Sequence, residues 1–350
     1  MKLSIITINY NNASGLRKTL ASVAAQTYHD IEHLIIDGGS TDGSVEAIKE
    51  YVAANPNNDP FFKHTINWVS EKDSGIYNAM NKGIEIALGR RIVNSFNRSE
   101  LVEDKNHGIE IALGRRVVND DHTSERDHTP YTVHHTSSQS DCGYIQILNS
   151  GDLLAAPDVT ERMMVALDSL NAQRSTLNEN GSPSIFYGNM LKSYDGKTII
   201  NRDTCGGNMY TPESFLYFYK GTLNHDCAYI RRDLFEKYGL YNEQMKICSD
   251  WEWYVRAIVL GGEKPIYTNI DVTIFDMNGV SESYGKNAEL IKKERREYLE
   301  KILPEAVLHD YDAFFFPILQ YQRLKKHHLW GIVYFIERVL FKLEKWRILR

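Results

Sequence analysis

Short apolar runs alternate with segments of helical spacing through residues 1–90, and this alternation limits the fold more than any other feature of the chain. Apolar, β-branched runs predict strands over residues 3–9, 34–36 and 66–70. Apolar residues at helical spacing predict helices over residues 13–26, 45–52 and 74–89, with Ser74 as the N-cap of the third helix. Strands and helices that alternate in this way predict a parallel sheet with right-handed crossovers and with helices on both faces. We therefore expect an α/β fold.

The connection between residues 91 and 142 does not fit this pattern. The sequence GIEIALGRR occurs at 83–91 and again at 108–116, and the first copy completes the third predicted helix. The next strand is predicted only at 144–148, although structureless connections longer than about 15 residues are uncommon in a compact domain. A true repeat fold needs at least three units. We interpret 91–142 as a hydrophilic insertion that contains a duplicated helix fragment.

The insertion is expected to lie away from any ligand site. Ligands bind at the carboxyl ends of the strands in an open α/β sheet, and helix-to-strand connections emerge at the opposite edge. The sheet pattern includes a further strand at 185–187 and stops after residue 280. We therefore predict one domain over 1–280, interrupted by 91–142, and a helical extension over 281–350.

Charge and composition exclude several classes of protein. The formal net charge is −6, and a general nucleic-acid binder needs a basic face, so we expect no nucleic-acid partner. The four cysteines show no metal-type or paired spacing, which favours reduced thiols in a cytoplasmic protein. No stretch reaches the roughly 18 uninterrupted apolar residues of a membrane helix.

The extension is predicted to form helices over 288–303 and 311–350. From residue 321 onward it has eight Lys and Arg residues against two Glu residues. A basic helix with aromatic side chains can lie on an anionic membrane, and a terminal helix can also pack against its own domain. We expect partial docking on the domain, with the basic edge of residues 321–350 facing the inner surface of the membrane.

Acidic residues follow three of the predicted strands. Asp37 ends the second strand, Asp73 follows the third, and Asp152 follows the strand at 144–148. Each residue alone is also compatible with a turn or a helix start. Because the carboxyl ends of parallel strands meet at one edge, we expect the three carboxylates to converge there. The glycines of the chain do not form GxGxxG after the first strand, so a dinucleotide site is not predicted.

Four segments in this order, SIITINYN, IIDGGSTDGS, SEKDSGIYNAMNKGI and ILNSGD, resemble the inverting family 2 glycosyltransferases of the GT-A fold. The resemblance covers about residues 3–90 and 143–275 and implies a Rossmann-like, mostly parallel sheet. It also implies transfer of a sugar from a nucleoside diphosphate sugar, with a UDP-sugar as the expected donor. The acceptor would be a saccharide or a lipid-linked saccharide, with inversion by single displacement, as in the assembly of bacterial surface polysaccharides.

The resemblance also implies which residues bind the donor. Asp37 and Asp73 would contact the base and ribose of the nucleotide. The same pocket would be lined by Thr7, Asn9 and Tyr10. Asp152 corresponds to the last acid of the DxD metal motif of these enzymes, whereas Asn149 replaces its first acid. Asp152 would therefore bind Mg²⁺ or Mn²⁺, because these ions accept few protein oxygens together with phosphates and water.

The candidate catalytic base lies in the segment CSDWEWYVRAI. Its acids Asp250 and Glu252 are also favoured as first-turn residues of a helix. The resemblance assigns the base to an acidic pair at this point, which gives the role to Asp250, with Glu252 as the alternative. A positioned carboxylate can accept the proton of the attacking hydroxyl. His225 matches a position near the acceptor and the diphosphate, although a single histidine is often structural.

Two other functions fit parts of the sequence. A nucleotide-sugar binding protein without catalysis is compatible with the incomplete DxD motif and the insertion. A cytidylyl- or uridylyltransferase would share nucleotide binding on a related sheet. The latter needs a basic loop after the first strand, and NYNNASG provides no cation there.

Overall fold

The structure is a computed structural model of the chain. It describes residues 1–56, 64–91, 143–176, 183–205, 212–278 and 287–345. The predicted insertion at 91–142 lies outside the described residues except for Arg91. The same holds for residues 281–286 at the start of the predicted extension and for 346–350 at its end.

Within the described residues, one sheet of nine strands organises the fold, in the order β3-β2-β1-β4-β8-β6-β9-β5, with β7 paired to β6. The strands are β1 (Leu3–Asn9), β2 (Ile31–Asp37), β3 (Thr65–Ser70), β4 (Tyr144–Asn149), β5 (Leu153–Leu154), β6 (Ile185–Ser193), β7 (Asn201–Asp203), β8 (Ala228–Arg231) and β9 (Pro265–Asp276). The pairs among β1 to β4 are all parallel, and β8 is antiparallel to β4 and β6. This arrangement confirms the predicted α/β class.

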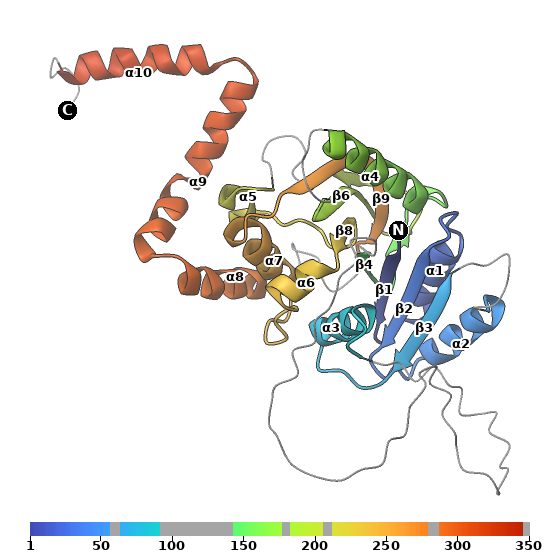
Figure 1. The fold of residues 1–350 in the computed structure, drawn as a ribbon. Coiled ribbons are helices and arrows are strands. Elements are labelled where there is room, and N and C mark those ends of the chain that lie inside the picture. Colours follow the sequence, from blue (N-terminus) through green and yellow to red (C-terminus); the bar gives the residue numbers. More distant parts are fainter. Residues whose placement is uncertain (57–63, 92–142, 177–182, 206–211, 279–286, 346–350) are drawn as a thin grey trace, which may run out of the picture. The chain divides into compact units, whose positions relative to one another are not determined.

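Helices cover both faces of the parallel half of the sheet, as expected (Figure 1). They are α1 (Ala13–Ala24), α2 (Ser44–Ala54) and α3 (Ile76–Ala87). Ile35 of β2 packs with apolar residues of α1 and α2, whereas its neighbours Leu34 and Ile36 belong to the cluster that contains Met80 of α3. Successive side chains of a strand point to opposite faces, so one apolar run in β2 serves two layers.

Two boundaries differ from the sequence prediction. Helix α3 begins at Ile76 after Gly75, whose φ of 137° favours glycine, so Ser74 is not the N-cap. Strand β2 is longer than predicted because Glu32 and His33 continue it. His33 is fully buried, with Nε2 2.9 Å from Thr7 Oγ1 and Nδ1 3.0 Å from the Tyr51 hydroxyl. The polar residues that interrupt the apolar run are thus paired inside the fold.

The second half of the fold contains α4 (Val159–Thr176), α5 (Phe215–Lys220), α6 (Asp233–Tyr238) and α7 (Ser249–Tyr254), and α7 continues as a π-helical turn over Val255–Leu260. The indoles of Trp251 and Trp253, both in α7, are almost fully buried. Their Nε1 atoms donate to the carbonyls of Phe218 (2.7 Å) and Gly239 (2.8 Å). These contacts fix the rotation of α7, and with it the directions of Asp250 and Glu252.

The C-terminal part contains α8 (Ala288–Ile302), α9 (Glu305–Lys326) and α10 (Trp330–Lys345). The prediction of one helix over 311–350 was wrong: the helix breaks after Lys326, and His328 there has a φ of 59°. Leu308 and Phe315 of α9 are buried, whereas no described residue of α10 is. In the described part of the chain, no helix is both long and apolar enough to cross a membrane.

The strand register sets the position of the site. Asn9 pairs with Asp37, Asp37 pairs with Ser70, and Asn149 pairs with Ile8, so four strand ends meet at one edge. Tyr144 pairs with Leu3 at the opposite edge. The chain therefore returns from residues 92–142 at the edge away from these polar residues.

Candidate functional site

Asp37 is the centre of a hydrogen-bond network at the end of β2. Its Oδ1 accepts from Asn9 Nδ2 (2.7 Å) and the Ser40 hydroxyl (2.6 Å). Its Oδ2 accepts from the Ser40 amide (3.0 Å) and the Ser70 hydroxyl (2.6 Å). Burial by itself raises the pKa of Asp37, but these hydrogen bonds outweigh it and leave the pKa below its usual value. The carboxylate therefore ties the ends of three strands together.

Asp73 and Tyr10 form the accessible side of this edge. The Tyr10 side chain is 65% exposed. Asp73 is half-buried, and its Oδ1 accepts from the Gly75 amide (3.1 Å). Burial raises the pKa of Asp73, and the negative charge of Asp37 adds to this effect. A Cβ on Gly38 would lie 2.4 Å from Asp73 Oδ2 and 3.1 Å from the Tyr10 ring, so glycine allows the two side chains to approach.

The three residues expected at the end of β1 have different environments. Thr7 is fully buried and contacts His33, which differs from the expectation that its side chain lines the nucleotide pocket. Thr7 lies within the strand, where its hydroxyl faces the layer under α2. Asn9 is buried at the edge, and its Oδ1 is one of the buried oxygens in the described structure that lack a hydrogen-bond partner. Such an acceptor is costly unless a ligand donates to it.

A tight turn after β4 holds Asp152. Gly151 adopts a φ of 116°, and its amide donates to the Thr19 hydroxyl (2.9 Å). Asp152 is 2% exposed, and its carboxylate accepts from the amides of Asn149 (3.2 Å) and Asp276 (3.1 Å). Burial, followed by the nearby charge of Asp226, raises the pKa of Asp152 to about 7. The charge of His225 and the two amide hydrogen bonds lower the pKa of Asp152 but do not outweigh burial.

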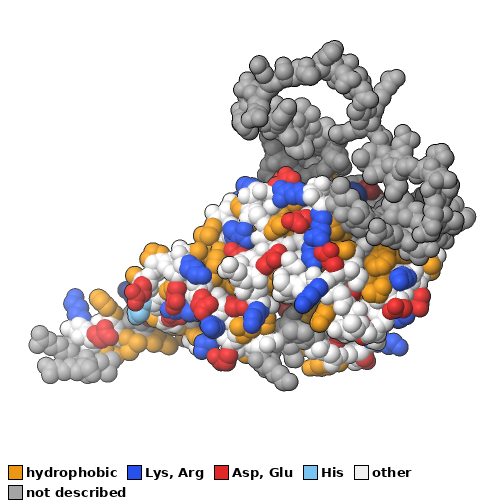
Figure 2. Space-filling model, turned by 90° about the horizontal axis from the view of Figure 1, so that it is seen from below, with side chains coloured by type: hydrophobic (Ala, Val, Ile, Leu, Met, Phe, Trp, Pro, Cys, Tyr) orange, Lys and Arg blue, Asp and Glu red, His pale blue; other side chains and the backbone are white. Residues whose placement is uncertain are grey.

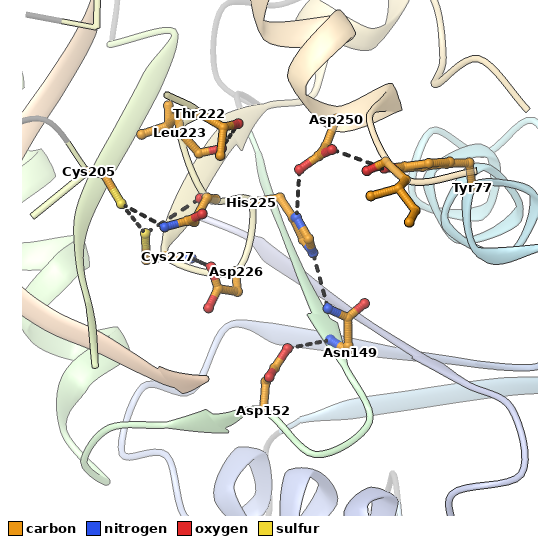
Figure 3. Close-up of polar contacts among 12 residues, drawn as sticks. Tyr77, Asn149, Asp152, Cys205, Thr222, Leu223, His225, Asp226, Cys227 and Asp250 are labelled. Atoms are coloured by element: carbon orange, nitrogen blue, oxygen red, sulfur yellow. Dashed lines mark hydrogen bonds and ion pairs between the residues drawn. The ribbon is translucent and has the colours of Figure 1, made fainter. Parts of the chain in front are cut away.

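His225 connects this turn to α7 (Figure 3). Its Nε2 lies 3.4 Å from Asn149 Nδ2, and its Nδ1 lies 3.4 Å from Asp250 Oδ2. Which ring nitrogen donates in these two contacts depends on the tautomer of His225. Burial lowers the pKa of His225, but the hydrogen bond and charge of Asp250 outweigh it and raise the pKa above its usual value.

Asp250 receives a second contact from Tyr77 of α3. The Tyr77 hydroxyl donates to Asp250 Oδ1 (3.0 Å) and also contacts the Ile247 carbonyl. Burial alone would raise the pKa of Asp250, but the interactions with His225, the Trp251 amide and Tyr77 lower it below the usual value. The side chains of Asp250 and His225 are 16% and 14% exposed, so both keep access to a ligand. Asp250 is thus an ionised acceptor at neutral pH.

Glu252, the alternative base, does not join this cluster. Its carboxylate pairs with Arg256 one turn later in the helix, at 2.9 Å and 3.1 Å. Arg256 also donates to the carbonyls of Tyr238 and Leu240. The Glu252 side chain is 6% exposed. These contacts favour a structural role for Glu252, as the partner of Arg256. Asp250 instead faces His225.

Asn149 and Asp152 provide part of a site for a divalent cation. The Asn149 Oδ1 atom is buried without a hydrogen-bond partner among the described residues, and the backbone amide of Asn149 donates to the carboxylate of Asp152. Two oxygens of this kind fit a hard cation that takes its other ligands from a diphosphate and water. The described residues contain no group of three or more His, Cys, Asp or Glu side chains able to hold a metal alone.

Sequence reasoning missed Tyr77, Ser40 and Ser70 as parts of the site. All three lie inside the quoted segments: Ser40 in IIDGGSTDGS, and Ser70 and Tyr77 in SEKDSGIYNAMNKGI. Nothing in the local pattern distinguishes Tyr77 from a core residue of α3, because its contact with Asp250 spans 173 positions. The buried Asp226, which accepts from Thr273 (2.9 Å) beneath His225, was likewise not predicted.

The sequence comparisons agree with this geometry. Residues 4–95 match the family described as Glycosyl transferase family 2. An uncharacterized glycosyltransferase of Mycobacterium tuberculosis H37Rv is 44% identical over 88 residues, which is 25% of this chain and 30% of the relative. A PGL/p-HBAD biosynthesis glycosyltransferase of Mycobacterium bovis is 36% identical over 86 residues, which is 25% of this chain and 31% of the relative. The chain thus matches less than a third of the length of these relatives.

The comparison with solved structures concerns the fold. Staphylococcus aureus TarS superimposes with a TM-score of 0.50 at 14% identity, over 90% of this chain and 43% of TarS. Residues 1–349 of TarS in complex with UDP give the same TM-score and identity, over 90% of this chain and 72% of that chain. The fold is accordingly the GT-A fold. The match to Glycosyl transferase family 2 covers residues 4–95, and the chain as a whole resembles TarS in fold.

Proposed function

We propose that this protein transfers a sugar from a nucleoside diphosphate sugar to a hydroxyl group of a saccharide or a lipid-linked saccharide. The donor is a UDP-sugar, and the anomeric configuration is inverted in a single displacement. One observation carries the proposal: the ionised carboxylate of Asp250 is connected through His225 to Asn149, beside Asp152, at the carboxyl edge of the sheet. An acceptor for a proton and a site for a diphosphate are thereby adjacent.

The edge formed by β1, β2 and β3 supports the binding of the nucleotide. Tyr10 offers an exposed ring, Asp73 a half-buried carboxylate, and Asn9 an unsatisfied acceptor oxygen. A base that stacks on an aromatic ring and donates to such oxygens would satisfy all three. Asp37 would hold the neighbouring residues in place and would not contact the nucleotide, because its carboxylate already accepts four hydrogen bonds. The choice of uridine is supported by the UDP complex of TarS, which shares the fold.

The residues of α7 and the loop before β8 would carry the chemistry. Asp250 accepts the proton of the acceptor hydroxyl as the oxygen attacks the anomeric carbon. His225 and Tyr77 hold the two carboxylate oxygens of Asp250 in place. Asn149 and Asp152 would hold the divalent cation. When it is bound, the cation neutralises the charge that develops on the leaving diphosphate.

The proposal is tested with the full chain and with its Asp250→Asn variant. Thermal melting is measured with UDP, GDP, CDP and dTDP, each with and without Mn²⁺, because a ligand of the native state raises the midpoint. Transfer from the matching UDP-sugar to saccharide acceptors is then followed by NMR of the anomeric proton. We expect a metal-dependent shift with UDP, a product of inverted configuration, and a variant that binds UDP but does not transfer.

Other outcomes would overturn specific parts of the proposal. A shift with UDP but no transfer or donor hydrolysis by the parent protein would indicate a nucleotide-sugar binding protein without catalysis. A retained anomeric configuration would exclude single displacement. A protein that melts cooperatively and shifts with none of the nucleotides would contradict the proposal as a whole.

A further inference from the structure

Helix α10 has an apolar face that the described structure leaves uncovered. We define this α10 face by residues spaced three or four positions apart, which lie on one side of a helix: Ile332, Phe335, Ile336, Val339 and Leu340. Their side chains are 59%, 67%, 49%, 39% and 44% exposed, respectively. A contiguous exposed apolar surface on a soluble protein marks an interaction site, whereas single exposed residues do not.

The α10 face is not needed for the core of the fold. No described residue of α10 is buried, and the helix follows the break at 327–329. The preceding helix α9 is docked through Leu308 and Phe315, and Phe315 lies beside Tyr219 of α5 with ring centroids 5.2 Å apart. A helix of this length is only marginally stable alone in water. A surface that binds the α10 face would therefore also stabilise the helix.

Basic residues border the α10 face on one side. The basic residues of α10 are Arg338, Lys342 and Lys345, and its acidic residues are Glu337 and Glu344. Lys342 lies two turns after Phe335, and Arg338 lies one turn before Lys342. Arg338 and Lys342 therefore lie together at one border of the α10 face. Figure 2 shows that basic, acidic and hydrophobic side chains are mixed on the face of the molecule seen from below. The Trp330 ring packs against Tyr321 with centroids 4.1 Å apart, which places aromatic side chains at the start of the helix.

We propose that α10 binds an anionic lipid surface, lying in its plane with the α10 face in the acyl region and with Arg338 and Lys342 near the head groups. Apolar area and attraction to anionic lipids both contribute to such binding. A second copy of the chain fits the face less well, because an anionic surface pairs with Arg338 and Lys342, whereas a second α10 brings the same cations to the border of the face. This inference revises the sequence prediction, since the apolar face of α10 and not only a basic edge makes the contact. It does not rest on the proposed function.

Sedimentation of the full chain with vesicles tests the proposal. Vesicles of phosphatidylcholine with 30% phosphatidylglycerol, on the order of physiological anionic content, are compared with pure phosphatidylcholine. We expect binding to the anionic vesicles that is at least tenfold stronger than to the neutral ones and that weakens at high salt. The Phe335→Asn/Val339→Asn variant should lose at least tenfold in binding. The Arg338→Gln/Lys342→Gln variant should lose the preference for anionic lipid.

A matched control removes exposed apolar side chains elsewhere. Val165 of α4 is 59% exposed and Ile200 is 51% exposed, and Val165→Asn/Ile200→Asn should bind vesicles like the parent. All variants should melt like the parent, because none of these residues is buried. Equal binding of parent and Phe335→Asn/Val339→Asn would overturn the proposal, as would the absence of binding to either vesicle. Light scattering provides the alternative outcome: a parent dimer that this variant dissociates, without vesicle binding, would show that a second copy covers the face.

Discussion

Nδ1 of His225 lies 3.4 Å from Oδ2 of Asp250, although the two residues come from different elements. His225 belongs to the loop before β8, and Asp250 to the first turn of α7. Their contact connects the turn after β4, through Asn149, to the helix that carries the candidate base. The donor half and the acceptor half of the proposed site thus meet at one imidazole.

Substitution of Asp250 should lower catalysis, whereas substitution of Glu252 should lower stability. Asp250→Asn should lower kcat by about 10²-fold or more, because general base catalysis contributes roughly 10² to 10⁴. Glu252→Gln should leave kcat within a few-fold but lower the free energy of unfolding by about 1–3 kcal/mol, since it removes the charge that pairs with Arg256. Steady-state kinetics and urea unfolding of both variants provide the measurement. The reverse pattern would assign the base to Glu252.

Asp73 and Asp37 provide a similar contrast for donor binding. Asp73→Asn should weaken UDP-sugar binding about tenfold and leave the melting midpoint unchanged, because Asp73 is half-buried with one backbone contact. Asp37→Asn should also lower the free energy of unfolding by about 1–3 kcal/mol, since an amide NH₂ would face donors that now bind a carboxylate. Calorimetric titration and thermal melting separate the two effects. A destabilised Asp73→Asn protein would instead indicate a structural role.

Removal of metal should stop transfer. A chelator should abolish activity and Mn²⁺ or Mg²⁺ should restore it, because Asn149 and Asp152 supply too few ligands to retain a metal without substrate. Asp152→Asn should raise the Mn²⁺ concentration for half-maximal activity about tenfold or more. The measurement is the transfer rate as a function of free Mn²⁺. Full activity in the chelator would show that the diphosphate leaves without a cation.

His33 should make the stability of the fold depend on pH. Burial, with a small contribution from His64, lowers the pKa of His33 from 6.5 to about 3. Between these values the unfolded chain binds a proton that the native state excludes, so stability falls as the pH drops below 6.5. Relative to His33→Gln, the parent should lose about 2 kcal/mol more between pH 7 and pH 5. Urea unfolding at both values checks this, and equal losses would show that His33 does not set the dependence.

Gly83 should be required for the packing of α3 on β1. A Cβ at this position would lie 2.4 Å from Cγ2 of Ile6, which is fully buried. Gly83→Ala should therefore lower the free energy of unfolding by about 1–3 kcal/mol, as overpacked core substitutions do. Gly331→Ala is the control, because nothing lies within 4 Å of an added Cβ there and α10 has no buried residue. An unchanged stability of Gly83→Ala would show that the α3 layer can shift.

The domain boundaries remain predictions. The interpretation of 91–142 as an insertion rests on the duplicated sequence GIEIALGRR. Arg91 is the one residue of this range that the structure describes. Pairing of Tyr144 with Leu3 supports the expected return of the chain at the edge opposite the site. The boundary at residue 281, which separates the extension 281–350 from the domain, is likewise a prediction from the sequence.

The sequence alone determined the strand and helix order of the first ninety residues and the convergence of Asp37, Asp73 and Asp152 at one edge. Both follow from local patterns: periodicity distinguishes strand from helix, and parallel strands bring their carboxyl ends together. Only the tertiary structure decided the direction of individual side chains. It placed Thr7 against His33, Glu252 against Arg256, and Tyr77 beside Asp250. These contacts depend on which surfaces pack across long sequence separations, and no local pattern specifies that packing.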